Sequence, residues 1–246
     1  MSKLASGSAA LEITSDPADD AVALSQLETR LPPLLSVIAG MVDLTGFFNL
    51  GHIFTAHVTG NLVVAAADAV HGGPFNVAQA LAIPVFMLAV AAAWLIAEAS
   101  RRRGVSLARL LLLVQFLLLV VLLIFSVITK PSADPDGLRA GVAVMIAVAA
   151  IACQYALLRL ALPKVVSTAV MTGNLTNAVL SLMDVLKNWR TLPPADAGRL
   201  RQSLHLLVGF LFGCVVATPA VALLRDWAWL LPAALSGAAI ALSAAK

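Results

Sequence analysis

The segment from Ser106 to Thr129 constrains this chain most, because its long run of Leu, Val and Phe contains a single charged residue, Arg109. A helix needs about 20 such residues to cross a hydrocarbon core of about 30 Å. The whole chain is 61% hydrophobic and 12% charged, against roughly 45–50% and about 25% in soluble domains. A soluble fold could not bury so much apolar surface, and continuous rather than alternating runs exclude a β-barrel. The sequence therefore predicts an all-α transmembrane protein.

The scarcity of charge and of sequence motifs excludes other classes of function. A net charge of +3 does not indicate nucleic-acid binding, since the aromatic content is only 6% and no base-stacking platform is visible. The chain contains no paired His-Glu metal motif, no serine nucleophile elbow and no phosphate-binding Gly-rich loop. We expect no enzyme activity, no metal and no cofactor.

Two regions differ sharply in composition. Residues 1–32 are hydrophilic, with acidic residues in excess of basic ones, and predict a disordered N-terminal tail in which a short helix over 21–31 is the alternative. Residues 33–245 predict a single transmembrane domain, in which six stretches are able to span the bilayer: 33–56, 77–99, 107–129, 138–160, 203–224 and 227–245.

Two further apolar stretches, 57–71 and 165–186, are broken by Thr, Gly and Asn. If neither crosses, 13 of the 16 Lys and Arg residues lie on the same side as the N-terminus; if both cross, the split becomes 7 to 9. Positive residues favour the cytoplasmic side. We therefore predict six spans, two non-crossing elements that are broken or re-entrant, and both termini in the cytoplasm.

The two broken stretches contain the same phrase. Residues 55–62 (TAHVTGNL) match 168–175 (TAVMTGNL) at six of eight positions, offset by 113. The match implies two repeats, over about 33–130 and 138–245, each with three spans. Because three is odd, the second repeat must be inverted relative to the first, which is a recurring plan of transporters with a site between the halves.

The repeated phrase supplies residues suited to a break in a membrane helix. Gly60 and Gly173 permit non-helical backbone, and Thr and Asn can cap the exposed helix ends; these are Thr59, Asn61, Thr172 and Asn174. A half-helix that starts there would direct its positive end at an anion or a carbonyl oxygen. The alternative is that these residues only pack at an interface between two helices.

Several of these features resemble the YoaK family of bacterial multi-pass membrane proteins, which has no established function. The resemblance covers about residues 33–245 and rests on matching residues in both halves, which are Ala39–Asp43, Gly46-Phe47, Phe54–Asn61, Gln154–Ala156, Arg159 and Met171–Leu175. Tyr155 departs from it, because Asn is expected there. The resemblance implies a bacterial inner-membrane protein and adds Gln154 to the candidate site residues, but it implies no substrate.

Asp43 lies in the middle of the first predicted span, where an acid costs roughly 2.5–3.5 kcal/mol on insertion scales. Such residues usually face a cavity or a partner, so Asp43 is a candidate for proton coupling or cation contact, and His57 could relay a proton with it. The alternatives are a carboxyl group held by hydrogen bonds to a helix break, and a capped interfacial histidine.

These features favour a secondary transporter or facilitator of a small solute. A passive channel and a non-transporting membrane partner are the alternatives. The expected partners are the lipid bilayer and the solute, with no nucleic acid. Gly209 and Gly213 form a small-xxx-small face that could pack within the chain or in a homo-oligomer.

Overall fold

The computed structural model describes residues 17–72, 76–163, 165–166, 168, 171–187 and 194–244, and among them it contains helices and no strand. The elements are α1 (Pro17–Asn49), α2 (Gly60–Val70), α3 (Val77–Arg103), α4 (Leu107–Thr129), the 3-10 helix η1 (Pro131–Ala133), α5 (Leu138–Ala161), α6 (Met171–Lys187), α7 (Pro194–Leu224), the 3-10 helix η2 (Arg225–Trp229) and α8 (Leu230–Ala244).

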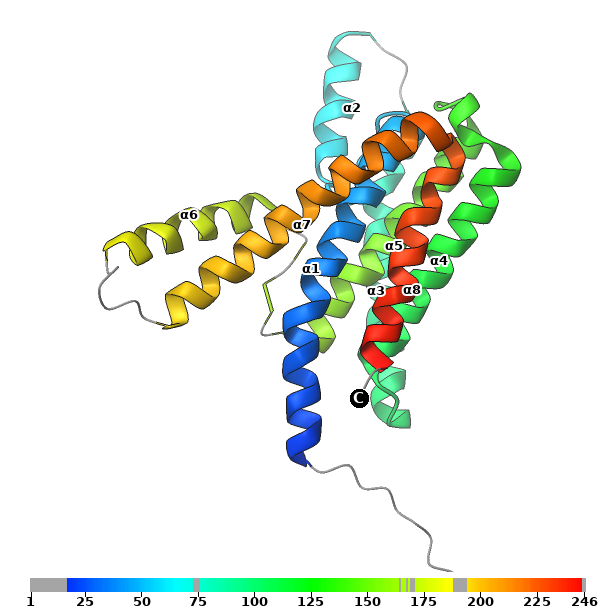
Figure 1. The fold of residues 1–246 in the computed structure, drawn as a ribbon. Helices are drawn as coiled ribbons and strands as arrows, with labels where there is room; N and C mark the ends of the chain where they lie inside the picture. The colour runs from blue at the N-terminus through cyan, green and yellow to red at the C-terminus, as the bar shows by residue number, and fades with distance from the viewer. Residues whose placement is uncertain are drawn as a thin grey trace, which may run out of the picture.

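Five helical segments of the described chain are long and apolar enough to cross a membrane. They are Leu27–Asn49, Val77–Arg103, Leu107–Thr129, Leu138–Ala161 and Gly198–Ser243. The fifth, of 46 residues, contains α7 and α8, and the chain reverses direction between them at η2 (Figure 1). The six predicted stretches therefore fall on five segments, the last of which is a helical hairpin.

The first predicted span is wrong at its end, because α1 stops at Asn49 and not at 56. Gly51 and His52 follow with φ of +74° and +56°, and two left-handed residues in succession cannot continue a right-handed helix. A side chain on Gly51 would also approach the carbonyl oxygen of Pro135 to 2.7 Å. At the other end, α1 begins at Pro17 and takes in the short helix over 21–31, whereas residues 1–16 of the predicted tail lie outside the described residues.

Both ends of the described chain lie at the same end of the helix bundle (Figure 1). Helix α1 starts there, α8 finishes there, and α3 begins at the opposite end, where α1 stops. Helices α2 and α6, which each follow or contain a Thr-Gly-Asn phrase, begin near the bundle and lead away from it; α2 packs against α3, and α6 against α7.

Helices α1 and α7 make the most intimate contact between elements. A Cβ added at Gly40 would overlap the carbonyl oxygen of Phe210, and one added at Gly213 would overlap that of Val37. Gly209 likewise approaches the carbonyl oxygen of Pro33. Small residues permit such close approach of two backbones. The structure thus uses the Gly209/Gly213 face within the chain.

Candidate functional site

The carboxylate of Asp43 holds the segment that follows α1, residues 50–59, which we call the returning segment. The segment runs back along the helix, so that Gly46 faces Thr55 and leaves room for it. The Oδ1 atom of Asp43 accepts hydrogen bonds from the backbone N–H groups of Thr55 and Ala56, both at 2.8 Å. Asp43 is only 5% exposed, and its acid is stabilised by charge-assisted bonds, which are about twice as strong as neutral ones.

The other oxygen of the same carboxylate, Oδ2, lies 2.6 Å from Nδ1 of His57. His57 lies outside the candidate spans, and its side chain is 39% exposed. The hydrogen bond to Asp43 raises the pKa of His57 above its usual value, against an opposing effect of burial. The pairing expected from the sequence is therefore present, and so is the hydrogen-bonded carboxylate that was its alternative.

Asn61 has a different role from the one its position suggests. Its Oδ1 accepts the N–H of Phe54 and its Nδ2 donates to the carbonyl of the same residue, both at 2.8 Å. Thr59, the residue before α2, makes no side-chain cap. The prediction that Asn61 and Thr59 cap the helix is thus wrong, because Thr59 makes no cap and the Asn61 amide binds the backbone of Phe54 in the returning segment. Gly60 lies under the Phe54 ring, where a Cβ would come within 3.2 Å.

The second half of the chain also contacts this segment. The hydroxyl of Tyr155 on α5 donates to the carbonyl oxygen of Ala56 at 3.1 Å, and the ring of Phe210 on α7 lies edge-on to His57 at 5.3 Å. Tyr155 was not among the residues predicted for the site, and it departs from the family pattern. Its single hydroxyl in an apolar helix was the available signal, since a buried tyrosine usually finds a hydrogen-bond partner.

Gln154 lies one residue away but serves another contact. Its Nε2 donates to the carbonyl oxygen of Leu35 at 2.9 Å, and its Oε1 accepts from Gln115 at 2.8 Å. This polar ladder joins α1, α4 and α5 through completely buried amides. Gln154 thus supports the helix that carries Asp43, and no hydrogen bond joins it to the returning segment among the described residues.

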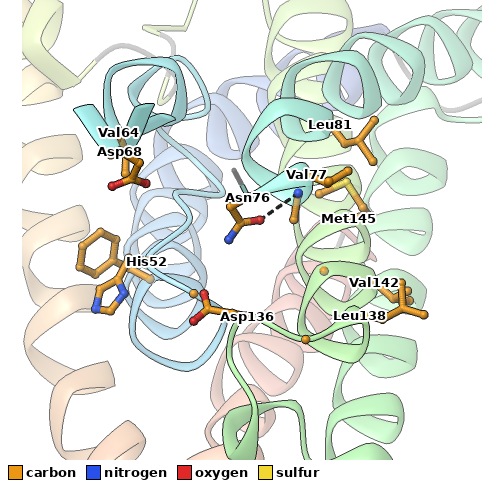
Figure 2. A pocket seen from close by; sticks show the side chains of 15 residues that line it. His52, Val64, Asp68, Asn76, Val77, Leu81, Asp136, Leu138, Val142 and Met145 are labelled. Atoms are coloured by element: carbon orange, nitrogen blue, oxygen red, sulfur yellow. Dashed lines mark hydrogen bonds between the residues drawn. The ribbon is translucent and has the colours of Figure 1, made fainter. Parts of the chain in front are cut away.

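A cavity of about 780 Å³ opens beside the returning segment, between α1, α2 and the first turns of α3 and α5. Figure 2 shows its polar side, formed by His52, Asp68, Asn76 and Asp136, facing an apolar wall that includes Met145. It lies at the end of the bundle opposite the termini, because α1 ends and α3 begins there. Pockets of this size and mixed lining are typical of small-molecule sites.

A row of aromatic rings runs from this cavity to the Asp43–His57 pair. Phe47, which lines the cavity, stacks at 4.8 Å on Phe54. Phe54 in turn lies 6.2 Å from the ring of His57. The two hydrogen bonds from Asn61 fix the backbone of Phe54. The position of these rings therefore depends on the first Thr-Gly-Asn phrase.

The second Thr-Gly-Asn phrase stands in the first turn of α6. Asn174 is buried and has a polar partner, whereas Thr172 is exposed and its carbonyl accepts the hydroxyl of Thr176. Gly173 lies between them, half-buried. The convergence of Asn61 and Asn174 on one solute stays a prediction. The residues just before α6, 169 and 170, lie outside the described ones.

Comparison with known proteins agrees with this architecture. The sequence matches the family described as Protein of unknown function (DUF1275) over residues 31–242. It is also 55% identical over 31 residues to the UPF0700 transmembrane protein YoaK of Bacillus subtilis (strain 168). That match covers 13% of this chain and 14% of the relative. No solved structure matches the chain. With its apolar helices, the chain is an integral membrane protein, and it belongs to the DUF1275 family, to which the YoaK resemblance pointed.

Proposed function

We propose that this protein is a secondary transporter or facilitator of a small solute in the bacterial inner membrane, with its termini in the cytoplasm. The observation that carries the proposal is the Asp43–His57 pair. An ionisable residue within a membrane span is expensive and usually marks a solute pathway or a proton relay. Here the acid lies 2.6 Å from a histidine that is partly exposed, so a proton can move between this pair and water.

The returning segment lies where the two halves of the chain meet, which supports a site between inverted repeats. Asp43 and His57 come from the first half, whereas Tyr155 and Phe210 come from the second. Helices α1 and α5, which open the two halves, run in opposite directions (Figure 1). In transporters built from inverted repeats, irregular backbone at membrane depth lines the site.

A route to the pair begins at the cavity opposite the termini. A solute would enter between Asp68 and Asp136, pass Phe47 and Phe54, and reach the carboxylate. Transfer of a proton from His57 or Asp43 would then change the charge that the solute meets. The contact between the Phe47 and Phe54 rings along this route supports a gated carrier rather than an open pore.

The test is solute uptake by the full chain reconstituted in liposomes that contain a pH-sensitive dye. A panel of small amines, amino acids, carboxylates and sugars is added with and without an imposed pH gradient. We expect a solute that accumulates only with the gradient and that moves protons with it. Asp43→Asn should abolish this accumulation and leave solute exchange without a gradient intact.

A matched control is available in Asp226, another buried carboxylate, which accepts the backbone N–H of Ser132 at 3.2 Å and its hydroxyl at 2.7 Å. Asp226→Asn should retain gradient-driven uptake, because this residue lies in η2, outside the route. Equal flux with and without the gradient, unchanged by Asp43→Asn, would indicate a passive channel. Loss of uptake in both variants would indicate that buried carboxylates here are structural.

A further inference from the structure

A second cleft lies between α1 and α7, near the start of the spans Leu27–Asn49 and Gly198–Ser243, with a volume of about 630 Å³. It is separate from the cavity beside the returning segment, since the two share no lining residue. Three basic side chains line it: Arg30 from α1, and Arg201 and His205 from α7. Two packed helices therefore present cationic groups to one cleft.

These arginines have no acidic partner among the residues that the structure describes. At the end of α3, Arg101 and Arg102 lie 3.7 Å and 3.4 Å from Glu98. Arg30 and Arg201, by contrast, are exposed and make no ion pair with a described carboxylate. Positive charge that lines a cleft and that no described carboxylate neutralises favours an anion, and the planar guanidinium group suits the oxygens of a phosphate.

The residues that follow the basic side chains along both helices indicate what kind of molecule carries the anion. Helices α1 and α7 run in the same general direction (Figure 1), and in both the basic residues of the cleft come before its apolar ones. The next turns of α1 contribute Leu34 and Val37, and those of α7 contribute Val208 and Phe212. Val208 and Phe212 are 61% and 56% exposed, so the wall continues onto the outer surface of the helices. The cleft is cationic at its mouth and apolar along its length.

We propose that this cleft binds an anionic phospholipid, with its phosphate at Arg30, Arg201 and His205 and an acyl chain along Val208 and Phe212. Basic pockets between transmembrane helices on the cytoplasmic side are suited to anionic headgroups. A free phosphate would use the basic mouth but would leave the apolar wall uncovered. The lipid accounts for both ends of the cleft, and the proposal does not depend on transport activity.

The test is binding of fluorescent phosphatidylglycerol to the full chain in detergent micelles, with unlabelled competitors. Phosphatidylglycerol should compete, phosphatidylcholine should compete at least tenfold more weakly, and glycerol phosphate and inorganic phosphate should not compete. A basic residue near a membrane surface contributes about 1 kcal/mol to the binding of anionic lipid, so each arginine should matter by about fivefold. The double variant Arg30→Gln/Arg201→Gln should lose about 30-fold in affinity, and the corresponding Lys variant should recover most of it.

The control double variant, Arg102→Gln/Arg103→Gln, removes the same amount of charge from the end of α3 and should change affinity by less than twofold. Phe212→Ala should weaken phosphatidylglycerol binding several-fold. Circular dichroism checks that each variant is folded. Equal losses in the two double variants would overturn the proposal in favour of bulk charge attraction. Competition by glycerol phosphate would overturn it in favour of a soluble phosphate, and equal competition by phosphatidylcholine would show that the cleft does not select a headgroup.

Discussion

Replacing Asp43 by Asn or by Ala should give two different losses of stability, because the two substitutions remove different parts of one interaction. The carboxylate accepts the N–H groups of Thr55 and Ala56, which lie on residues 0% and 4% exposed. Alanine leaves both donors buried and unpaired, at about 1–3 kcal/mol each, so we expect a loss of about 4 kcal/mol. Asparagine keeps an accepting oxygen, but each bond falls from the charged range of about 1.5–3 kcal/mol to the neutral range of about 0.5–1.5 kcal/mol. We therefore expect Asp43→Asn to lose about 2 kcal/mol.

The assay is a denaturant titration of the full chain in detergent micelles, followed by far-ultraviolet circular dichroism. Asp184→Asn, which changes an exposed acid on α6, is the control, and it should stay within about 0.5 kcal/mol of the parent protein. If the Asn and Ala variants of Asp43 lose equal stability, the amide oxygen does not replace the carboxylate as acceptor. The account of the returning segment would then be refuted.

Four further outcomes are expected. The pKa of His57 is raised in the folded state, so the folded protein keeps this proton to a higher pH than the unfolded chain does. The stabilisation from the protonated His57 is therefore complete below its usual pKa of 6.5 and is lost as the pH rises through the raised pKa. A series of melting temperatures against pH measures this loss. Asn61→Ala leaves a backbone donor and acceptor unpaired and should cost about 2 kcal/mol in the same titration. Gly213→Ala should cost about 1–3 kcal/mol, because its Cβ overlaps the backbone of α1. Single cysteines at Asp134 and Arg103 should react with an impermeant maleimide from opposite sides of the membrane.

Each of these outcomes has a control variant or a result that would contradict it. His57→Gln should flatten the decline of melting temperature with pH, and an unchanged decline would assign it to another group. Gly198→Ala adds a Cβ that meets nothing within 4 Å and should be neutral or slightly stabilising. If it costs as much as Gly213→Ala, the close approach of α1 and α7 is not the cause. Labelling of both cysteines from one side of the membrane would contradict the six-span topology. An Asn61→Ala variant as stable as the parent would show that the hydrogen bonds from Asn61 to Phe54 do not contribute to stability.

The sequence predicted the helices better than the connections between them. Spans such as 107–129 are determined locally, by uninterrupted apolar residues, and α4 has those bounds. The end of α1 is not determined in that way, because Leu50, Ile53 and Phe54 prolong the apolar run. Only the backbone at Gly51 and His52 shows that the chain turns back.

The sequence predicted the two ionisable residues of the candidate site but not the contacts that hold them in place. Asp43 and His57 attracted attention because ionisable groups are rare in apolar surroundings. The hydrogen bonds from Asn61 and the contact from Tyr155 depend on how distant segments pack, and the cavity lined by Asp68 and Asp136 depends on the placing of four elements. A single sequence contains no signal for that arrangement.

The backbone contact between α1 and α7 has a consequence for any movement of the protein. Where glycines bring two helices together, as at Gly40 and Gly213, no side chain is available to change rotamer and let the helices slide. Two further hydrogen bonds tie them, from Ser36 to the carbonyl of Leu206 and from the Cys214 thiol to that of Gly40. One helix from each half thus belongs to a pair that is held by backbone contacts and hydrogen bonds. If the protein transports a solute as proposed above, the movement that exposes the returning segment to the other side of the membrane must take place in the remaining helices. A crosslink between α1 and α7 should then leave uptake intact, whereas a crosslink from either helix to a neighbouring one should abolish it.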